Sequence, residues 1–153
     1  MKIQRITSIH AGSVVLLALL LSSCAAGGST IEISQGQVVG KWANPSGATV
    51  VFEKDGTFTS GNLAKVIPLR AGCADSLASG KWLLLARGTE VAKHSDPTGS
   101  TITLRPNGRD AELGCGIEAS VQKDKGGINI CLVEDPDQAC SSNELLRKPD
   151  SDQ

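Results

Sequence analysis

Short runs of alternating hydrophobic and polar residues constrain the fold of this chain more than any other feature. Trp82 and Leu84 share one face of such a run, and Ile128 and Ile130 share one face of another. A period of two is typical of β-strands that are buried on one side. Clusters of Gly, Pro, Asp and Asn separate the runs, and the chain has 17 glycines. Since no stretch shows helical periodicity, the pattern predicts one all-β domain over residues 38–148 with about eight short strands.

Two turns predict hairpins within this domain. The segment Lys54-Asp55-Gly56-Thr57 separates Phe52 from Phe58, and Asp-Gly between hydrophobic runs is a strong hairpin signal. Residues 123–127 form a second turn, after which we expect Val121 to face Ile128 and Ala119 to face Ile130. An antiparallel barrel or closed sandwich would pair all the strand edges, which otherwise promote aggregation.

The N-terminal segment has the three parts of an export signal. Lys2 and Arg5 precede an apolar run over residues 14–21, which ends in Leu21-Ser22-Ser23-Cys24. The run is shorter than the ~20 apolar residues of a membrane-spanning helix, which argues against an uncleaved anchor. Its last four residues resemble a bacterial lipobox, although an ordinary signal peptide is the alternative. The resemblance implies that residues 1–23 are removed and that Cys24 carries a diacylglyceryl group. We therefore expect an extracytoplasmic protein on the outer face of a bacterial membrane.

Composition divides the remainder of the chain. Residues 24–37 are mostly small and polar, which predicts a flexible tether, and residues 149–153 form a polar tail. Losing Lys2 and Arg5 with the leader reduces 15 basic residues to 13 against 16 acidic ones, a net charge near −3. This balance argues against a nucleic-acid partner, which would require a basic face. We expect a monomer.

The cysteines indicate two disulfides. Without Cys24, four of the five cysteines remain: Cys73, Cys115, Cys131 and Cys140. The alternative is a zinc site, but no Cys-x-x-Cys pair is present. Four cysteines allow three connectivities. If Cys115 points inward and Cys131 outward in the second hairpin, a bond between them is excluded by geometry. This argument favours the pairs Cys73–Cys115 and Cys131–Cys140, although one bulge would reverse the alternation.

Two further motifs support a family resemblance. Gly40-Lys41-Trp42 recurs as Gly80-Lys81-Trp82, but two copies do not establish a repeat architecture. The first copy looks like the Gly-x-Trp signature on the first strand of lipocalin-like barrels. Together with the lipobox and a late Asp135-Pro136-Asp137, it is similar to small actinobacterial lipoproteins of unknown function. The resemblance implies a lipocalin-like barrel and a lipid anchor, and it implies no activity.

No group of residues predicts catalysis. His94 lies in a polar segment, and a serine nucleophile would require a histidine held within hydrogen-bond reach. Glu134, Asp135 and Asp137 could bind calcium, but they lack the spacing of an EF-hand loop. An acidic turn closed by the Cys131–Cys140 bond explains them better. We therefore expect no enzyme, no cofactor and no metal.

Two binding functions remain open. A barrel that carries a small apolar molecule would enclose a cavity of a few hundred Å3. Six residues would line this cavity: Val38, Trp42, Phe52, Phe58, Trp82 and Ile102. The alternative is a protein-interaction module with a packed core, such as an inhibitor or accessory subunit of an envelope enzyme. Its contact loop would lie within residues 61–78 or 86–99. The first function is our prediction from the sequence.

Overall fold

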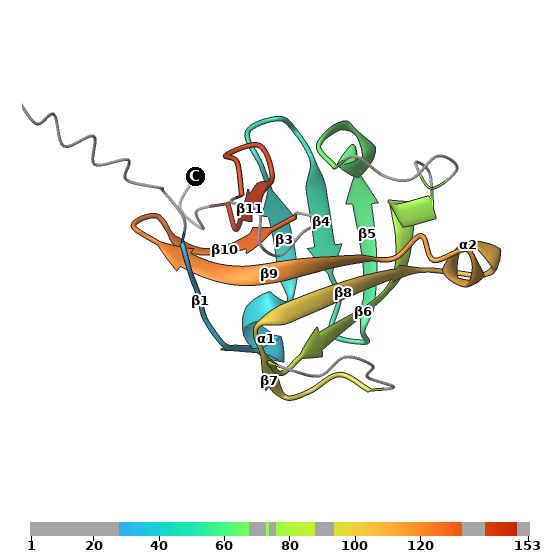
Figure 1. Cartoon of the computed structure of the whole chain (residues 1–153), viewed down its shortest axis with the longest axis horizontal. Coiled ribbons are helices and arrows are strands. Elements are labelled where there is room, and N and C mark those ends of the chain that lie inside the picture. Colours follow the sequence, from blue (N-terminus) through green and yellow to red (C-terminus); the bar gives the residue numbers. More distant parts are fainter. Residues whose placement is uncertain (1–27, 68–72, 74–75, 88–93, 133–139, 150–153) are drawn as a thin grey trace, which may run out of the picture.

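The chain folds into a closed eight-stranded antiparallel barrel (Figure 1). A computed structural model describes residues 28–67, 73, 76–87, 94–132 and 140–149. Each strand of the barrel pairs with the next one along the chain, and the last pairs with the first. The strands are β3 (Gly40–Ala43), β4 (Thr49–Phe52), β5 (Thr57–Gly61), β6 (Ser79–Leu85), β8 (Thr101–Pro106), β9 (Ile117–Asp124), β10 (Gly127–Cys131) and β11 (Leu145–Arg147). The predicted all-β fold class is confirmed.

The first predicted hairpin is present between β4 and β5. Phe52 and Phe58 are directly opposite each other, and both side chains point into the barrel. The turn follows from its sequence: Gly56 has a φ of 81°, and the Asp55 carboxylate accepts a hydrogen bond from the Thr57 amide at 2.9 Å. A positive φ is readily adopted by glycine. A hydrogen bond from the Thr57 hydroxyl, and then the one from the Thr57 amide, lower the pKa of Asp55.

The second hairpin is present, but its predicted register is wrong by two residues. Val121 lies opposite Ile130 rather than Ile128, because the turn closes tightly at Asp124 and Gly127. Gly127 has a φ of 102°, which permits this short connection. A shift of two residues leaves every side chain on its predicted face.

The segment predicted to be a flexible tether is ordered from Ser29 onward. It forms β1 (Ser29–Thr30), β2 (Ile33–Ser34) and α1 (Gln35–Val38). Ile33 and Val38 are buried in the core, which accounts for the order in this segment. Val38, the first residue of the predicted β domain, lies in a helical turn and not in a strand. A capping box between Ser34 and Gln37 begins this turn.

Short elements cover both ends of the barrel. Antiparallel strands place alternate connections at opposite ends, and α1 lies at the lower end in Figure 1. There β2 pairs with β7 (Thr98–Gly99). The other end carries η1 (Leu63–Lys65), η2 (Ser76–Ala78) and α2 (Arg109–Glu112). Leu63 and Leu77 join the same hydrophobic cluster as the side chains inside the barrel. The core therefore extends from the barrel into the elements that cover its ends.

The two Gly-Lys-Trp segments both lie near the start of a strand, but their glycines are required for different reasons. Gly40 has a φ of 119°, a conformation that favours glycine. Gly80 lies where a Cβ would be 2.0 Å from the carbonyl oxygen of Arg105 on β8. Only a residue without a side chain permits this approach of the two strands.

The barrel closes through a narrow seam. β11 pairs with β3 through Arg147 and Ala43. Beside this pair, the Lys148 ammonium donates a hydrogen bond to the Val39 carbonyl oxygen at 2.9 Å and lies 5.2 Å from the Trp42 ring centroid. Leu146 is fully buried on the inner face. Side-chain contacts therefore supplement the few backbone hydrogen bonds of this seam.

Candidate functional site

The six residues predicted to line a ligand cavity all lie in the buried core. Their exposed fractions are 0–3 %, and they belong to one hydrophobic cluster: Val38, Trp42, Phe52, Phe58, Trp82 and Ile102. β3, β4, β5, β6 and β8 supply five of them, and α1 supplies Val38. Alternation with outward residues brings the five strand residues together, as the sequence predicted, whereas Val38 joins them from α1. Such low exposure leaves little surface on these side chains that could face a space large enough for a ligand.

Both indole rings have hydrogen-bond partners within the protein. The Trp42 Nε1–H donates to the Val38 carbonyl oxygen at 2.7 Å, and the Trp82 Nε1–H donates to the Glu53 carbonyl oxygen at 3.0 Å. Trp82 also packs edge-on against Phe52, with ring centroids 5.5 Å apart. Buried tryptophan normally finds a partner for this polar group. These contacts account for both tryptophans as structural residues.

The two predicted disulfides are present. Cys73 is bonded to Cys115, with Cα atoms 5.3 Å apart, and Cys131 is bonded to Cys140, with Cα atoms 5.9 Å apart. The first ties the connection between β5 and β6 to the residues that precede β9. The second links the end of β10 to the segment before β11. Disulfides persist in oxidising compartments, so the two bonds are compatible with an extracytoplasmic location.

The described residues contain no cluster of histidine, cysteine and acidic side chains that could hold a metal ion. His94 is exposed next to the chain segment that covers the edge of β6. In that segment, the Ser95 hydroxyl accepts a hydrogen bond from the Leu84 amide at 2.9 Å, so it has a structural partner. Glu134, Asp135 and Asp137 lie outside the described residues. Neither helix described here, α1 or α2, is long and apolar enough to cross a membrane.

An open hollow of about 450 Å3 lies beside the barrel seam. Its lining combines apolar and charged groups: Gln37, Trp42, Gly126, Ile128, Arg147 and Lys148. Desolvation lowers the pKa of Lys148. The lining of the hollow therefore includes apolar groups, from Trp42 and Ile128, beside the cationic groups of Arg147 and Lys148. Sequence reasoning missed it, because α1, β10 and β11 meet here only after the barrel closes.

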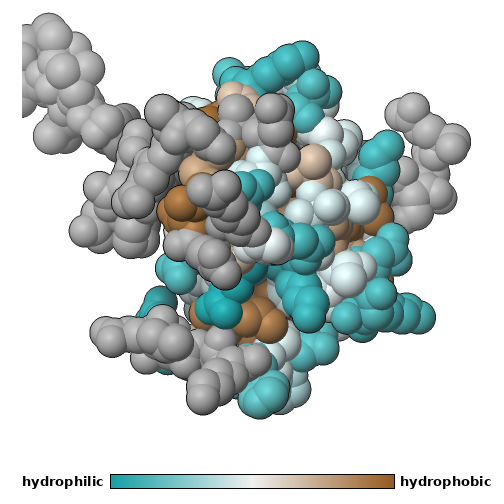
Figure 2. All heavy atoms as spheres, turned by 90° about the vertical axis from the view of Figure 1, so that its right-hand side faces the viewer, coloured by the Kyte–Doolittle hydropathy of each residue, from teal (hydrophilic) through white to brown (hydrophobic). Residues whose placement is uncertain are grey.

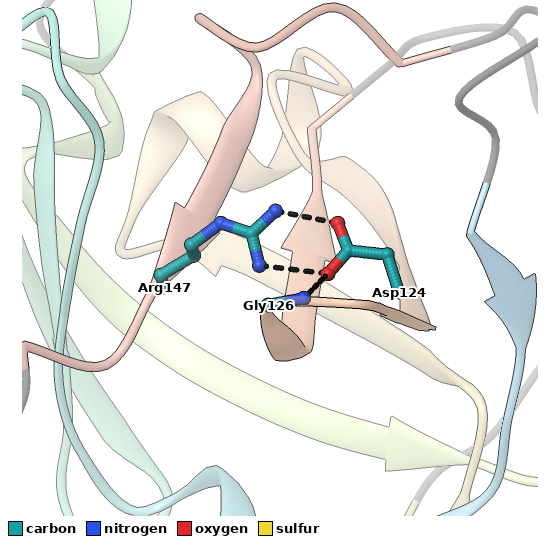
Figure 3. A network of polar contacts seen from close by, with 3 residues as sticks. All are labelled: Asp124, Gly126 and Arg147. Atoms are coloured by element: carbon teal, nitrogen blue, oxygen red, sulfur yellow. Dashed lines mark hydrogen bonds and ion pairs between the residues drawn. The ribbon is translucent and has the colours of Figure 1, made fainter.

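An ion pair fixes the turn between β9 and β10 (Figure 3). Asp124 accepts two hydrogen bonds from the Arg147 guanidinium, one of them at 3.0 Å, and one from the Gly126 amide at 2.7 Å. The hydrogen bonds from Arg147 lower the pKa of Asp124, and this carboxylate in turn raises the pKa of Arg147. Arg147 follows Leu146 on β11, so the pair connects this turn to the barrel seam. The ion pair therefore has a structural role, because it holds the turn against β11.

Two polar side chains on the outer barrel face are buried without a hydrogen-bond partner among the residues that the structure describes. Asn129 has no exposed surface, and neither its amide nitrogen nor its amide oxygen has a partner in the described ranges. The Thr103 hydroxyl is buried in the same way on β8. Both residues alternate with core residues, so the pattern predicts their outward direction. The pattern does not indicate which residues cover these two side chains.

The face seen in Figure 2 carries hydrophilic residues over most of its coloured surface. Hydrophobic residues form separate areas among them, which is ordinary for a protein surface. Leu113, directly after α2, is 59 % exposed and is the large hydrophobic residue that stands out in the described part of the chain. One exposed leucine does not define an interface.

The fold and these features define a closed antiparallel barrel with a buried aromatic core and two disulfides. Searches against protein-family models, curated proteins and solved structures found no match. The assignment of a function therefore depends on the physical features of this chain.

Proposed function

We propose that this chain is a non-enzymatic, extracytoplasmic lipoprotein that is anchored to a bacterial membrane through Cys24 and binds another envelope protein. The main observation in support of protein binding is that the side chains inside the barrel are buried. A ligand pocket has a volume of about 300–1,000 Å3 and leaves accessible surface on the side chains around it. Here Val38, Phe52 and Ile102 expose 0–1 % of their surface. This supports a packed interior and an outer binding surface.

A small-ligand carrier is the second candidate. The observation in its favour is the hollow beside the seam, where Trp42 and Ile128 offer apolar surface and Lys148 offers a positive charge. This hollow is open, and Trp42 is only 1 % exposed. The apolar contact available there is small, so we rank this function below protein binding.

Overfilling the barrel tests the packed interior on which the first candidate depends. Val50 is fully buried on β4, whereas Thr59 is exposed on the outer face of β5. In a packed interior, Val50→Phe should lower the free energy of unfolding by about 1–3 kcal/mol. Thr59→Phe adds a ring to the surface and should change it by less than about 0.5 kcal/mol. Urea unfolding of the two variants and the parent measures both values.

A hollow barrel gives the opposite result. Val50→Phe would then fold with unchanged stability, and it would block a stoichiometric apolar dye that the parent protein binds. Either observation contradicts the packed interior. A stable Thr59→Phe variant shows that the added ring alone does not disturb folding.

The anchor is tested separately. Intact mass spectrometry of protein extracted from membranes should show loss of residues 1–23 and a diacylglyceryl group on Cys24. Cys24→Ala should abolish acylation and release the protein or leave it unprocessed. Membrane retention and an unchanged acyl mass in this variant would refute the lipobox interpretation.

A further inference from the structure

The first described residues fix the place where the chain leaves the barrel. Ser29 and Thr30 of β1 pair with Lys123 and Gln122 at the end of β9. Gly28 is already packed there, because a Cβ on it would lie 3.0 Å from the Lys123 carbonyl oxygen. The chain therefore joins the barrel directly beside the turn that connects β9 to β10.

Only a short piece of chain separates this point from Cys24. The four residue steps from Cys24 to Gly28 span at most ~14 Å when fully extended. The other end of β9, at Ile117, is six residues from Lys123, which corresponds to ~20 Å along the strand. Even when fully extended, this piece of chain therefore cannot carry the anchor at Cys24 as far as the end of the barrel that carries α2.

This turn presents positive charge. Lys123 and Lys125 are both exposed. The carboxylate between them, Asp124, is engaged by Arg147 (Figure 3). Lysines close to an anionic membrane surface each contribute about a fivefold gain in binding at ordinary salt concentration. Two acidic residues, Asp150 and Asp152, come after Arg147 in the sequence, and both lie outside the described residues.

We propose that the β9–β10 turn faces the membrane and that Lys123 and Lys125 contact anionic phospholipid headgroups. The inference rests on the proposed anchor at Cys24. In this orientation η1, η2 and α2 lie at the end of the barrel that points away from the lipid. That end is then the part of the surface that a protein partner reaches.

Lysine labelling of the whole acylated protein tests this orientation. The protein is bound to vesicles of equimolar phosphatidylcholine and phosphatidylglycerol and treated with a water-soluble amine-reactive ester. Mass spectrometry then gives the labelling rate of each lysine, with the unacylated Cys24→Ser protein in solution as reference. We expect Lys123 and Lys125 to be labelled about fivefold more slowly on the vesicles. Lys65 in η1, at the opposite end, should keep its rate within about twofold and serves as the internal control.

Protection of Lys65 equal to or greater than that of Lys125 would overturn the proposed orientation. Vesicles of phosphatidylcholine alone test the contribution of charge, because the protein stays anchored but the headgroup attraction is lost. Protection of Lys125 should then decrease; undiminished protection overturns the headgroup contact.

Failure of the anchor is recognised independently of these rates. The acyl mass and co-flotation with vesicles are measured before labelling. Protein without an acyl group, or protein that does not float with vesicles, contradicts the proposed function itself. Acylated, floating protein with a uniform labelling pattern contradicts only the orientation.

Discussion

Replacing Gly80 by alanine tests the close approach of β6 and β8. The added Cβ would lie 2.0 Å from the Arg105 carbonyl oxygen and 2.8 Å from Cε1 of Phe58. Neither atom can move away easily. The Phe58 ring is packed in the core, and the Arg105 carbonyl oxygen belongs to the backbone of the paired strand β8. Relief of the clash therefore requires the two strands to separate by about 1 Å. Overfilled cores typically lose about 1–3 kcal/mol, and we expect Gly80→Ala to reach about 3 kcal/mol because backbone must move.

Thermal unfolding followed by circular dichroism measures this effect. At about 4 °C per kcal/mol for a domain of this size, the melting temperature should fall by about 12 °C. Gly61→Ala is the matched control, because its Cβ would meet only the Thr49 hydroxyl at 3.1 Å. This contact can be relieved by rotating one side chain, so we expect a loss below about 1 kcal/mol. A Gly80→Ala protein that melts within about 2 °C of the parent would show that the strands are not in such close contact.

Three other substitutions test separate contacts. Trp82→Phe should cost about 1–2 kcal/mol in urea unfolding, because a six-membered aromatic ring remains but the pyrrole part of the indole and its hydrogen bond to the Glu53 carbonyl oxygen are lost. Asp124→Asn should cost at most about 1 kcal/mol near neutral pH, since the ion pair is partly exposed. The pKa of Asp124 is lowered in the folded protein, so the stability it contributes is present above its unfolded-state pKa. The difference in unfolding free energy between the parent and Asp124→Asn should therefore vanish as the pH falls through the folded-state pKa of Asp124. A difference that does not change with pH would show that the ion pair does not stabilise the fold. Removing the Cys73–Cys115 bond, whose cysteines are 42 residues apart, should cost about 4 kcal/mol, against about 2.6 kcal/mol for the bond whose cysteines are 9 residues apart. Two variants, each with both cysteines of one disulfide replaced by serine, are compared by their denaturant midpoints. A larger loss of stability from removing the bond with the shorter loop would contradict this expectation.

The fold class could be predicted from the sequence because strand alternation is a local property. Ile102 and Leu104, for example, point inward on β8, as their spacing predicts. The two Gly-Lys-Trp segments show the limit of this reasoning. Their letters are identical, but Gly40 is required by its backbone conformation and Gly80 by a strand that lies 25 residues away in the sequence. Such a contact has no local signature.

The structure departs most from the prediction in the N-terminal segment. Its small and polar residues predict a tether, but Ile31 and Ile33 alternate within it and pack against the core. β1 and β2 have two residues each, and their partners lie about 65 to 95 residues farther along the chain. Strands this short are stabilised by tertiary contacts rather than by local preference. The alternation of the two isoleucines was the available signal.

The adjacency of β3 and β11 affects how the protein is made. A ribosome makes a polypeptide from its amino end, so residues 40–43 are synthesised long before residues 145–147. Until the final strand arrives, two strand edges stay open, and such edges can pair with other chains. A truncated product that lacks only the last ten residues would lose Leu146 and Arg147 together and keep both edges unpaired. Closure of the barrel therefore depends on the synthesis of residues 145–147.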